Sequence, residues 1–178
     1  FSCKGRGFCP SCGGRRMADT AAHLIDSVVP EVPVRQWVLT LPFALRYRLA
    51  FDAELQAAVL SLFVRALFAS LRRRARRRGR RSTLHCGAVT FVQRFGDALN
   101  LNVHFHTLAL DGVYERDLSG REKFRPLPPP EASEVEWVVR RVARGLVRLL
   151  ARRGLSPETD PGTADPLALR RAAIGVLR

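Results

Sequence analysis

One segment of the chain constrains its fold more than any other, the run LNLNVHFHTLALDG from Leu99 to Gly112. The run has the composition of a β-strand, and successive side chains of a strand point to opposite faces of the sheet. His104 and His106 therefore leave the sheet on one face. The opposite face takes the apolar residues Val103, Phe105 and Ala109. The sequence predicts one face that is buried and one that can hold a metal ion, with positions left open for a substrate oxygen.

A second strand-like run, Leu84–Arg94, precedes this segment, and the residues FGDALN between them carry turn signals. The two runs are therefore expected to form a β-hairpin. With a tip at 98–99, Gln93 lies opposite His104, because paired positions sum to a constant along antiparallel strands. Gln93 is the predicted third ligand of the metal. Asp97 is the alternative if the turn is shorter, since a change of register moves every partner.

The remaining patterns predict an α+β domain, an antiparallel sheet with packed helices. Apolar residues at helical spacing, from Leu55 to Leu67, form a stripe expected to be buried, and Asp52 is expected to cap that helix after a break near Phe51. The other predicted elements are a helix over 17–29, a strand over 35–41, a helix starting at 43 and ending near 78, a hairpin over 113–116 and 123–127, a helix over 131–153, and a helix over 167–178.

The N-terminal segment holds a cysteine cluster, Cys3, Cys9 and Cys12, with glycines after the last. A Cys-x-x-Cys knuckle lets two thiolates reach one tetrahedral zinc ion, and glycine relieves strain at the turn. Structural zinc takes four ligands, and His23 is a candidate for the fourth. A redox-active cysteine pair and a chance cluster are the alternatives. Cys86 stands apart and is expected to be a small buried residue.

The most informative feature of the composition is its positive charge. The chain has 30 Lys and Arg against 16 Asp and Glu, which gives a formal net charge of +14. Such an excess favours polyanions, nucleic acid first and an anionic membrane surface second. Arginines interrupt every apolar run, so no membrane span is expected. The densest arginine run suits phosphate contact better than helix capping or a solvated tail. The predicted DNA contacts are Arg72, Arg73, Arg74, Arg76, Arg77, Arg78, Arg80 and Arg81.

Three features in this order carry a family resemblance: the cysteine cluster, the run VTFVQRFGD over Val89–Asp97, and the triplet His104-Phe105-His106. Together they resemble the HUH (histidine, hydrophobic, histidine) transposases of the insertion sequence 91 family, rolling-circle enzymes that cut single-stranded DNA. The resemblance implies an HUH endonuclease-like fold with a ferredoxin/RRM-like core. It divides the chain into a partial zinc-binding domain over 1–16, a linker helix over 17–34, and a nuclease-like domain over 35–178, truncated at its C-terminus.

The resemblance also implies a chemistry. His104, His106 and Gln93 would be the catalytic metal ligands for Mg²⁺ or Mn²⁺, and the cysteines would hold a structural Zn²⁺. In the family further Cys or His ligands upstream complete the zinc site, which is the alternative to His23. The partner would be single-stranded DNA at transposon ends, met in the cytoplasm at the nucleoid. In the family a pair of tyrosines on a helix downstream of the triplet attacks the phosphodiester, whereas this chain has only Tyr47 and Tyr114 and neither belongs to such a pair. We therefore expect a fragment that lacks both ends and does not cut DNA alone.

Two other functions fit the sequence. In a non-catalytic zinc-containing nucleic-acid-binding module, the knuckle and the arginines would supply all of the activity. In a zinc-stabilised regulatory protein, nucleic acid would be incidental. The sequence does not specify the oligomeric state.

Overall fold

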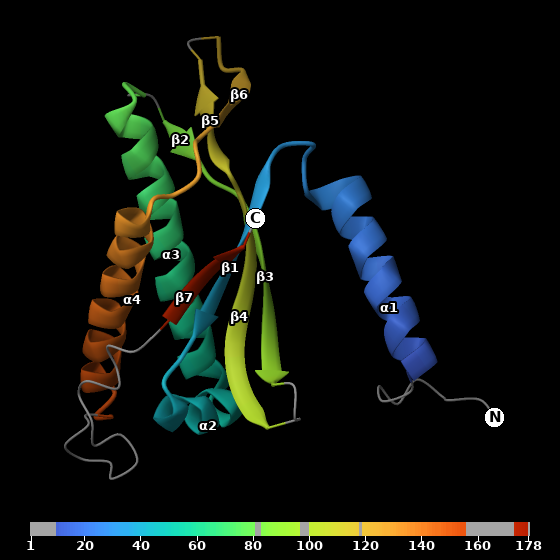
Figure 1. The fold of residues 1–178 in the computed structure, drawn as a ribbon, viewed down its shortest axis with the longest axis vertical. Coiled ribbons are helices and arrows are strands. Elements are labelled where there is room, and N and C mark those ends of the chain that lie inside the picture. Colours follow the sequence, from blue (N-terminus) through green and yellow to red (C-terminus); the bar gives the residue numbers. More distant parts are fainter. Residues whose placement is uncertain (1–9, 81–82, 97–99, 118, 156–172, 178) are drawn as a thin grey trace. The chain divides into compact units, whose positions relative to one another are not determined.

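The computed structural model describes residues 10–80, 83–96, 100–117, 119–155 and 173–177. The chain forms two compact units, Phe1–Val32 and Pro33–Arg178. The first unit contains the α-helix α1 (Pro10–His23) and the short π-helix η1 (Leu24–Val28). The second unit contains all of the strands and the other three helices of the described residues (Figure 1).

The helix of the first unit begins earlier than the sequence predicted. A helix was predicted only from position 17, after a glycine turn, but α1 begins at Pro10 and continues through Gly13 and Gly14. Proline suits the first turn of a helix, because the N–H that it lacks would be unpaired there. Each helical glycine costs about 1 kcal/mol, and the helix offsets this by pairing the backbone groups of the segment. Cys3 and Cys9 lie outside the described residues.

The main sheet has four strands in the order β3-β4-β1-β7, with antiparallel neighbours throughout. The strands are β1 (Val34–Thr40), β3 (Ala88–Phe95), β4 (Leu101–Leu110) and β7 (Ala173–Leu177). The prediction of a helix over 167–178 was wrong at β7. This segment pairs with β1, which would otherwise leave a row of backbone groups unpaired at the sheet edge. Its local preferences are mixed, because the β-branched Ile174 and Val176 favour a strand whereas Gly175 is unfavourable in either element.

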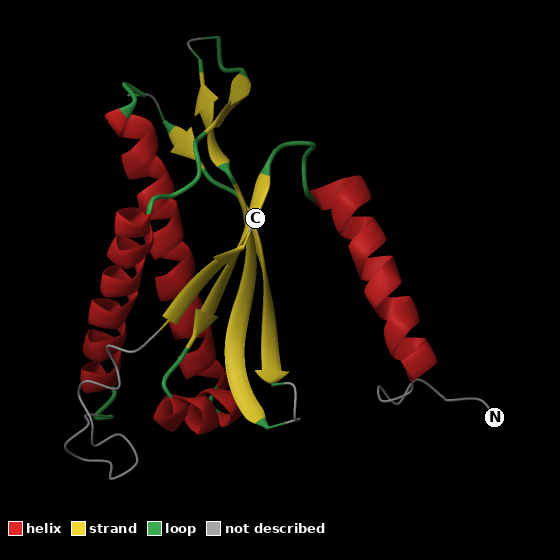
Figure 2. Ribbon diagram, in the orientation of Figure 1, coloured by secondary structure: helices red, strands yellow, loops and turns green. Residues whose placement is uncertain are grey.

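Three helices pack against one face of this sheet (Figure 2). They are α2 (Phe43–Phe51), α3 (Ala53–Arg77) and α4 (Ala132–Arg152). The predicted break is confirmed, since Asp52 lies between α2 and α3 and its Oδ1 accepts the N–H of Leu55 at 2.8 Å. The core joins residues from both layers, including Trp37, Leu39, Val103 and Phe105 of the sheet and Val59, Phe63, Leu67, Val138, Val142 and Leu146 of the helices.

A second, smaller sheet has the order β2-β5-β6. Its strands are β2 (Leu84–His85), β5 (Gly112–Arg116) and β6 (Glu122–Pro126), so the predicted second hairpin is confirmed. The single strand predicted over 84–94 is instead divided, because Leu84 packs with Leu71 and Val113 in a separate small core. Cys86 lies at this division and is partly buried, and burial raises its pKa to about 11.

Within the described ranges one helix, α3, is long and apolar enough to cross a membrane. An 18-residue window of it has a mean hydropathy of 1.5, which corrects the expectation that arginines interrupt every such run. Its apolar stripe contains Val59, Phe63 and Leu67, all of which are buried in the core. This is the pattern of a core helix in a folded domain.

A buried carboxylate joins α3 to α4. Glu134, in the first turn of α4, accepts hydrogen bonds from Arg73 and Arg77 of α3, with the Arg77 contact at 3.0 Å. Ser70 Oγ lies 3.4 Å from the same carboxylate. A buried carboxylate needs such partners, because water no longer solvates its charge.

The Glu134→Gln variant should therefore be less stable than the parent chain by about 2–3 kcal/mol in urea-induced unfolding, since it leaves arginine charges at the helix interface without their counter-charge. Glu136→Gln is the matched control two residues further along α4. Glu136 pairs with Arg140 in an exposed i,i+4 bridge, and its loss should change stability by less than about 0.5 kcal/mol. Equal effects of the two substitutions would contradict the assignment of Glu134 as the interhelical anchor.

Candidate functional site

His104 and His106 lie on the face of the main sheet opposite to α2, α3 and α4. Their ring centroids are 4.9 Å apart, with an angle of 60° between the planes. Between them Phe105 enters the core, as the alternation of the strand predicted. The predicted pairing of Gln93 with His104 is also confirmed, and Thr40 of β1 occupies the register position on the other side of His104. His104 thus has a polar register partner on each side, whereas the partners of His106 are the apolar Val38 and Phe91.

The ring of His104 has a defined tautomer. Its Nδ1 lies 2.6 Å from the backbone carbonyl oxygen of Asn102, and because a carbonyl oxygen can only accept, Nδ1 must donate. The neutral ring therefore keeps a free lone pair on Nε2. A metal-binding histidine is commonly oriented by such a bond from its other nitrogen. With only 9 % of its surface exposed, His104 is held firmly in place.

The ring of His106 is held from β1. The amide nitrogen of Gln36 lies 2.6 Å from Nδ1 of His106, and in this arrangement the amide donates to the ring. A half-turn of the Gln36 amide presents its oxygen instead, so that Nδ1 carries the proton and Nε2 becomes free for a ligand. Burial, and second the charge of His104, lower the pKa of His106. Both effects favour the neutral ring that a metal requires.

Asn102 adds an oxygen that the sequence reasoning missed. It precedes His104 by two residues on β4 and therefore shares the histidine face. Its Oδ1 is buried and has no hydrogen-bond partner within the described part of the chain. A buried unpaired oxygen is costly unless a ligand completes it. The alternation that selected the histidines could have selected Asn102 as well.

The donor set fits a divalent ion of intermediate softness. In the described ranges no three His, Cys, Asp or Glu side chains gather closely enough to hold a metal. The histidine pair instead shares its sheet face with two amide residues, Asn102 on the same strand and Gln93, the register partner of His104 on β3. Mixed nitrogen and oxygen ligands suit Mn²⁺ and are compatible with Mg²⁺. Asp97, the alternative third ligand, lies outside the described residues.

Most of the predicted DNA-binding arginines already have partners within the protein. Arg72 donates to the backbone oxygen of Leu84 at 3.1 Å, and Arg80 lies 3.4 Å from Glu115. Arg74 is buried and donates to the backbone oxygen of Pro128. Burial lowers the pKa of Arg74, although nearby carboxylates oppose the shift. Arg76, Arg77 and Arg78 are exposed, whereas Arg81 lies outside the described residues.

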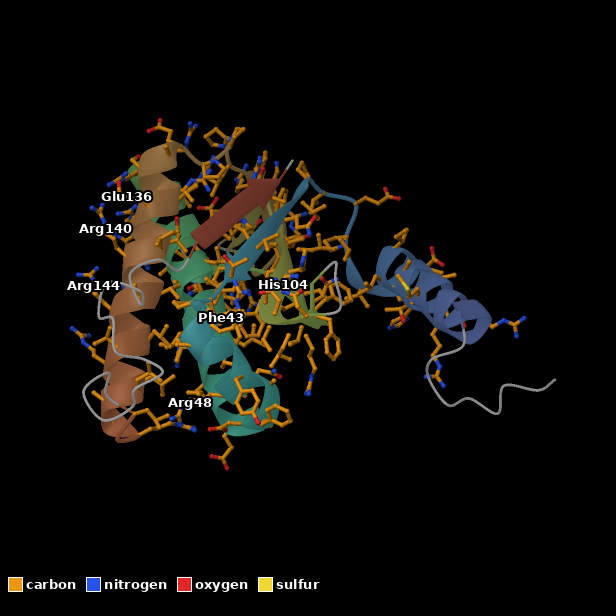
Figure 3. The ribbon with its side chains drawn as sticks, turned by 60° about the horizontal axis from the view of Figure 1, so that its bottom comes forward. Phe43, Arg48, His104, Glu136, Arg140 and Arg144 are labelled. Carbon is orange, nitrogen blue, oxygen red and sulfur yellow. The ribbon has the colours of Figure 1, made fainter. Side chains whose placement is uncertain are left out.

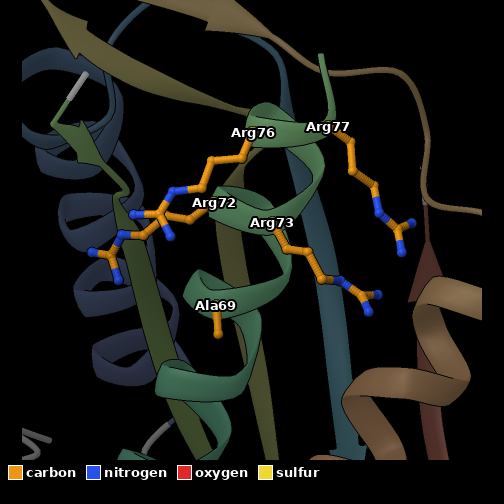
Figure 4. Close-up of a pocket in the computed structure, with 5 residues that line it drawn as sticks. All are labelled: Ala69, Arg72, Arg73, Arg76 and Arg77. Atoms are coloured by element: carbon orange, nitrogen blue, oxygen red, sulfur yellow. The ribbon is translucent and has the colours of Figure 1, made fainter. Parts of the chain in front are cut away.

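Figure 4 shows how the exposed end of this run is arranged. Arg72 and Arg76 project to one side of α3, whereas Arg73 and Arg77 project to the other side, toward α4. Together with Ala69 these four arginines line a surface pocket. The two that face α4 are those bound to Glu134. Arg76 is therefore the member of this pocket best placed to meet an external phosphate.

A second arginine cluster was not predicted. Arg65 of α3 lines a groove with Arg141, Arg144 and Arg148 of α4, over a floor of Leu62 and Gly145. A Cβ at position 145 would come within 3.0 Å of Leu62, so glycine allows the two helices to approach here. Figure 3 shows Arg144, with Arg140, pointing outward from α4. The helical spacing of the α4 arginines is visible in the sequence, but their position beside Arg65 depends on the packing of the two helices.

Neither tyrosine belongs to a tyrosine pair. Tyr47 is exposed on α2, and Tyr114 lies in β5, where its ring contacts that of Phe124 at a centroid distance of 5.3 Å. β5 belongs to the smaller sheet, whereas the histidine pair belongs to the main sheet.

Two protein-family models match the chain. A model described as "Transposase zinc-binding domain" matches residues 1–41, and one described as "Putative transposase" matches residues 87–154, which include β3, β4 and both histidines. The chain belongs to the insertion sequence 91 type of transposases. No curated protein and no solved structure matches it.

Membership of this family supports several of the expectations in their broad form. The match at the N-terminus supports Zn²⁺ as a metal of the transposase. A transposase acts on DNA, so DNA is the partner of the chain. The region of the second match extends from β3 through the histidine strand β4 to the end of α4. It therefore includes the arginines of α4 described above.

The lowered pKa of His106 makes a direct prediction. In a proton NMR titration His106 should titrate below the ordinary value of 6.5, so that its ring stays neutral as the pH falls through that value. Because part of the shift comes from the charge of His104, the His104→Asn variant should move the pKa of His106 back upward. A pKa of His106 at or above 6.5 in the parent chain would contradict this description of its surroundings.

Proposed function

We propose that the chain is the metal-binding and DNA-binding part of a rolling-circle transposase, which nicks single-stranded DNA at transposon ends. One observation supports this most strongly: His104 and His106 lie together on one sheet face with their ring centroids 4.9 Å apart, and the hydrogen bond at Nδ1 of His104 leaves the lone pair of Nε2 for a ligand. An antiparallel sheet that carries such a pair between two flanking strands is the arrangement that an HUH nuclease needs. The transposase would act in the cytoplasm, at the nucleoid.

In this proposal His104 and His106 hold a Mg²⁺ or Mn²⁺ ion, with an oxygen from Gln93 or Asn102. The bound ion would polarise the phosphodiester and stabilise charge on the leaving oxygen. Asn102 and Gln36 hold the two imidazole rings at Nδ1, so each residue positions a metal ligand. Cys3, Cys9 and Cys12 supply thiolates to the structural Zn²⁺ of the N-terminal domain.

The predicted arginine contacts divide by their partners. Arg76 and Arg78 are exposed at the end of α3 and would meet phosphates directly. Five others already bind a carboxylate or a backbone oxygen of the protein. To contact DNA, each would replace that partner by a phosphate or bind both: Arg72, Arg73, Arg74, Arg77 and Arg80. Arg65, Arg141, Arg144 and Arg148 extend the positive surface along the groove between α3 and α4. Arginine is well suited to such contacts, because its guanidinium can form forked hydrogen bonds to phosphate.

Metal titration tests the histidine site. The parent chain should bind Mn²⁺ in isothermal titration calorimetry, whereas His104→Ala/His106→Ala should show no measurable binding because both nitrogen ligands are gone. Gln36→Ala should weaken binding by about 10- to 100-fold, as expected for a residue that orients a ligand. Separate Gln93→Ala and Asn102→Ala variants identify the oxygen ligand by the larger loss.

His85→Ala is the matched control, since His85 is an exposed histidine on β2 in the smaller sheet. It should leave the affinity for Mn²⁺ unchanged. If the double histidine variant binds Mn²⁺ as tightly as the parent chain, the nuclease proposal is wrong. A non-catalytic DNA-binding module would then remain, provided that the same variant keeps its affinity for DNA.

DNA binding by the 178-residue chain should be strong in salt-poor buffer and should weaken steeply as salt is added. For single strands, the logarithm of the affinity should fall with a slope of about −0.7 per phosphate contact against the logarithm of the salt concentration. The chain should form no covalent adduct with the DNA, because neither of its tyrosines belongs to a downstream pair. A protein–DNA adduct on a denaturing gel would refute that second expectation.

A further inference from the structure

Three aromatic side chains form an exposed row along α2. Phe43, Tyr47 and Phe51 are 81 %, 67 % and 74 % exposed, and their spacing of four residues puts them on one side of the helix. The opposite side of α2 packs into the core through Leu45 and Leu49. A single exposed ring on a surface is ordinary, but a contiguous apolar row marks an interaction site. We call Phe43, Tyr47 and Phe51 the aromatic row.

The aromatic row lies at the same end of the main sheet as His104. β1 ends at Thr40, which pairs with His104, and Phe43 follows only three residues later, a reach of at most about 11 Å. The other end of α2 is fixed to β3, because Arg94 donates to the backbone oxygen of Ala50 at 3.1 Å. Arg94 directly follows Gln93, the second register partner of His104. Both ends of α2 are thus joined to the end of the sheet that carries the histidine pair, with α2 on the opposite sheet face.

The charge along α2 favours a polyanion, and the carboxylates that follow it, Asp52 and Glu54, pair with Arg153. α2 carries Arg46 and Arg48 and has no acidic residue. The guanidinium of Arg46 lies 5.9 Å from the centroid of the Phe43 ring, so a positive charge and an aromatic face are presented together. A second copy of this chain is a poor occupant, because each copy has a formal charge of +14.

We infer that the aromatic row is a stacking platform for the bases of single-stranded DNA, and that it leads the strand toward the histidine pair. Proteins that bind single strands combine aromatic rings, on which bases stack, with positive charge that follows the phosphates. Duplex DNA cannot use the row, because its bases already cover one another's faces. The assignment of DNA rests on the proposed function, whereas the position of the row at this sheet end rests on the strand register.

An oligonucleotide without bases separates stacking from charge. We expect Phe43→Leu/Phe51→Leu to weaken binding of fluorescently labelled oligothymidine by about tenfold or more in anisotropy titrations. The same variant should bind an abasic oligonucleotide of equal length as tightly as the parent chain, because that strand offers phosphates and no base faces. Leucine keeps the positions apolar, so the loss reports on the rings.

Tyr47 provides the matched control. Tyr47→Phe keeps the ring and should keep the affinity for oligothymidine, whereas Tyr47→Leu should lower it. Equal loss of affinity for the abasic strand, or unchanged affinity for oligothymidine in the double leucine variant, would overturn the platform. A change in sedimentation of that variant without a change in DNA affinity would identify the row as a protein interface and would also overturn it.

The Mn²⁺ titration keeps this test distinct from that of the proposed function. A leucine variant that still binds Mn²⁺ but binds oligothymidine as the parent does defeats the platform alone. A parent chain that fails to bind Mn²⁺ defeats the metal site alone, and the contrast between oligothymidine and the abasic strand can still be measured.

Discussion

The candidate site depends on the antiparallel pairing of β4 with a strand on each side. β4 sends Val103 and Phe105 into the core and His104 and His106 out of the other face. β3 then places Gln93 beside His104, and β1 places Gln36 against the ring of His106. Backbone hydrogen bonds fix these positions, and a shift of one residue would reverse the face of every side chain. Burial of Phe105 thus fixes the orientation of the two histidines.

The arginines show a second physical constraint, the competition between internal and external anions. A run of arginines looks in sequence like one continuous phosphate-binding surface. In the folded chain Glu134 binds two of them and Glu115 another, while a backbone carbonyl binds the buried Arg74. The run therefore contributes to the joint between α3 and α4 as well as to the positive surface. The groove that contains Arg65 and Arg144 adds charge from two helices that are distant in sequence.

Local patterns predicted much of the fold. The cap at Asp52, the hairpin with its Gln93 partner, the strand at β1 and the amphipathic α4 all follow from nearest-neighbour chemistry and periodicity. The predictions were wrong where contacts between distant segments decide the secondary structure. The segment at β7 has ambiguous local preferences, and pairing with β1 makes it a strand. Leu84 was assigned to the long hairpin, but its burial with Leu71 and Val113 divides that strand in two.

The sequence by itself determined the residue types of the site, the shared face of the two histidines and the large positive charge, because each depends on composition or on the two-residue period of a strand. Only the tertiary structure decided that Gln36 contacts His106, that Asn102 has an unpaired buried oxygen, and that the aromatic row lies at the histidine end of the sheet. Such features depend on contacts between residues far apart in the chain or on the burial of an atom. Strand pairing and helix packing decide both the contacts and the burial, and neither can be derived from local sequence.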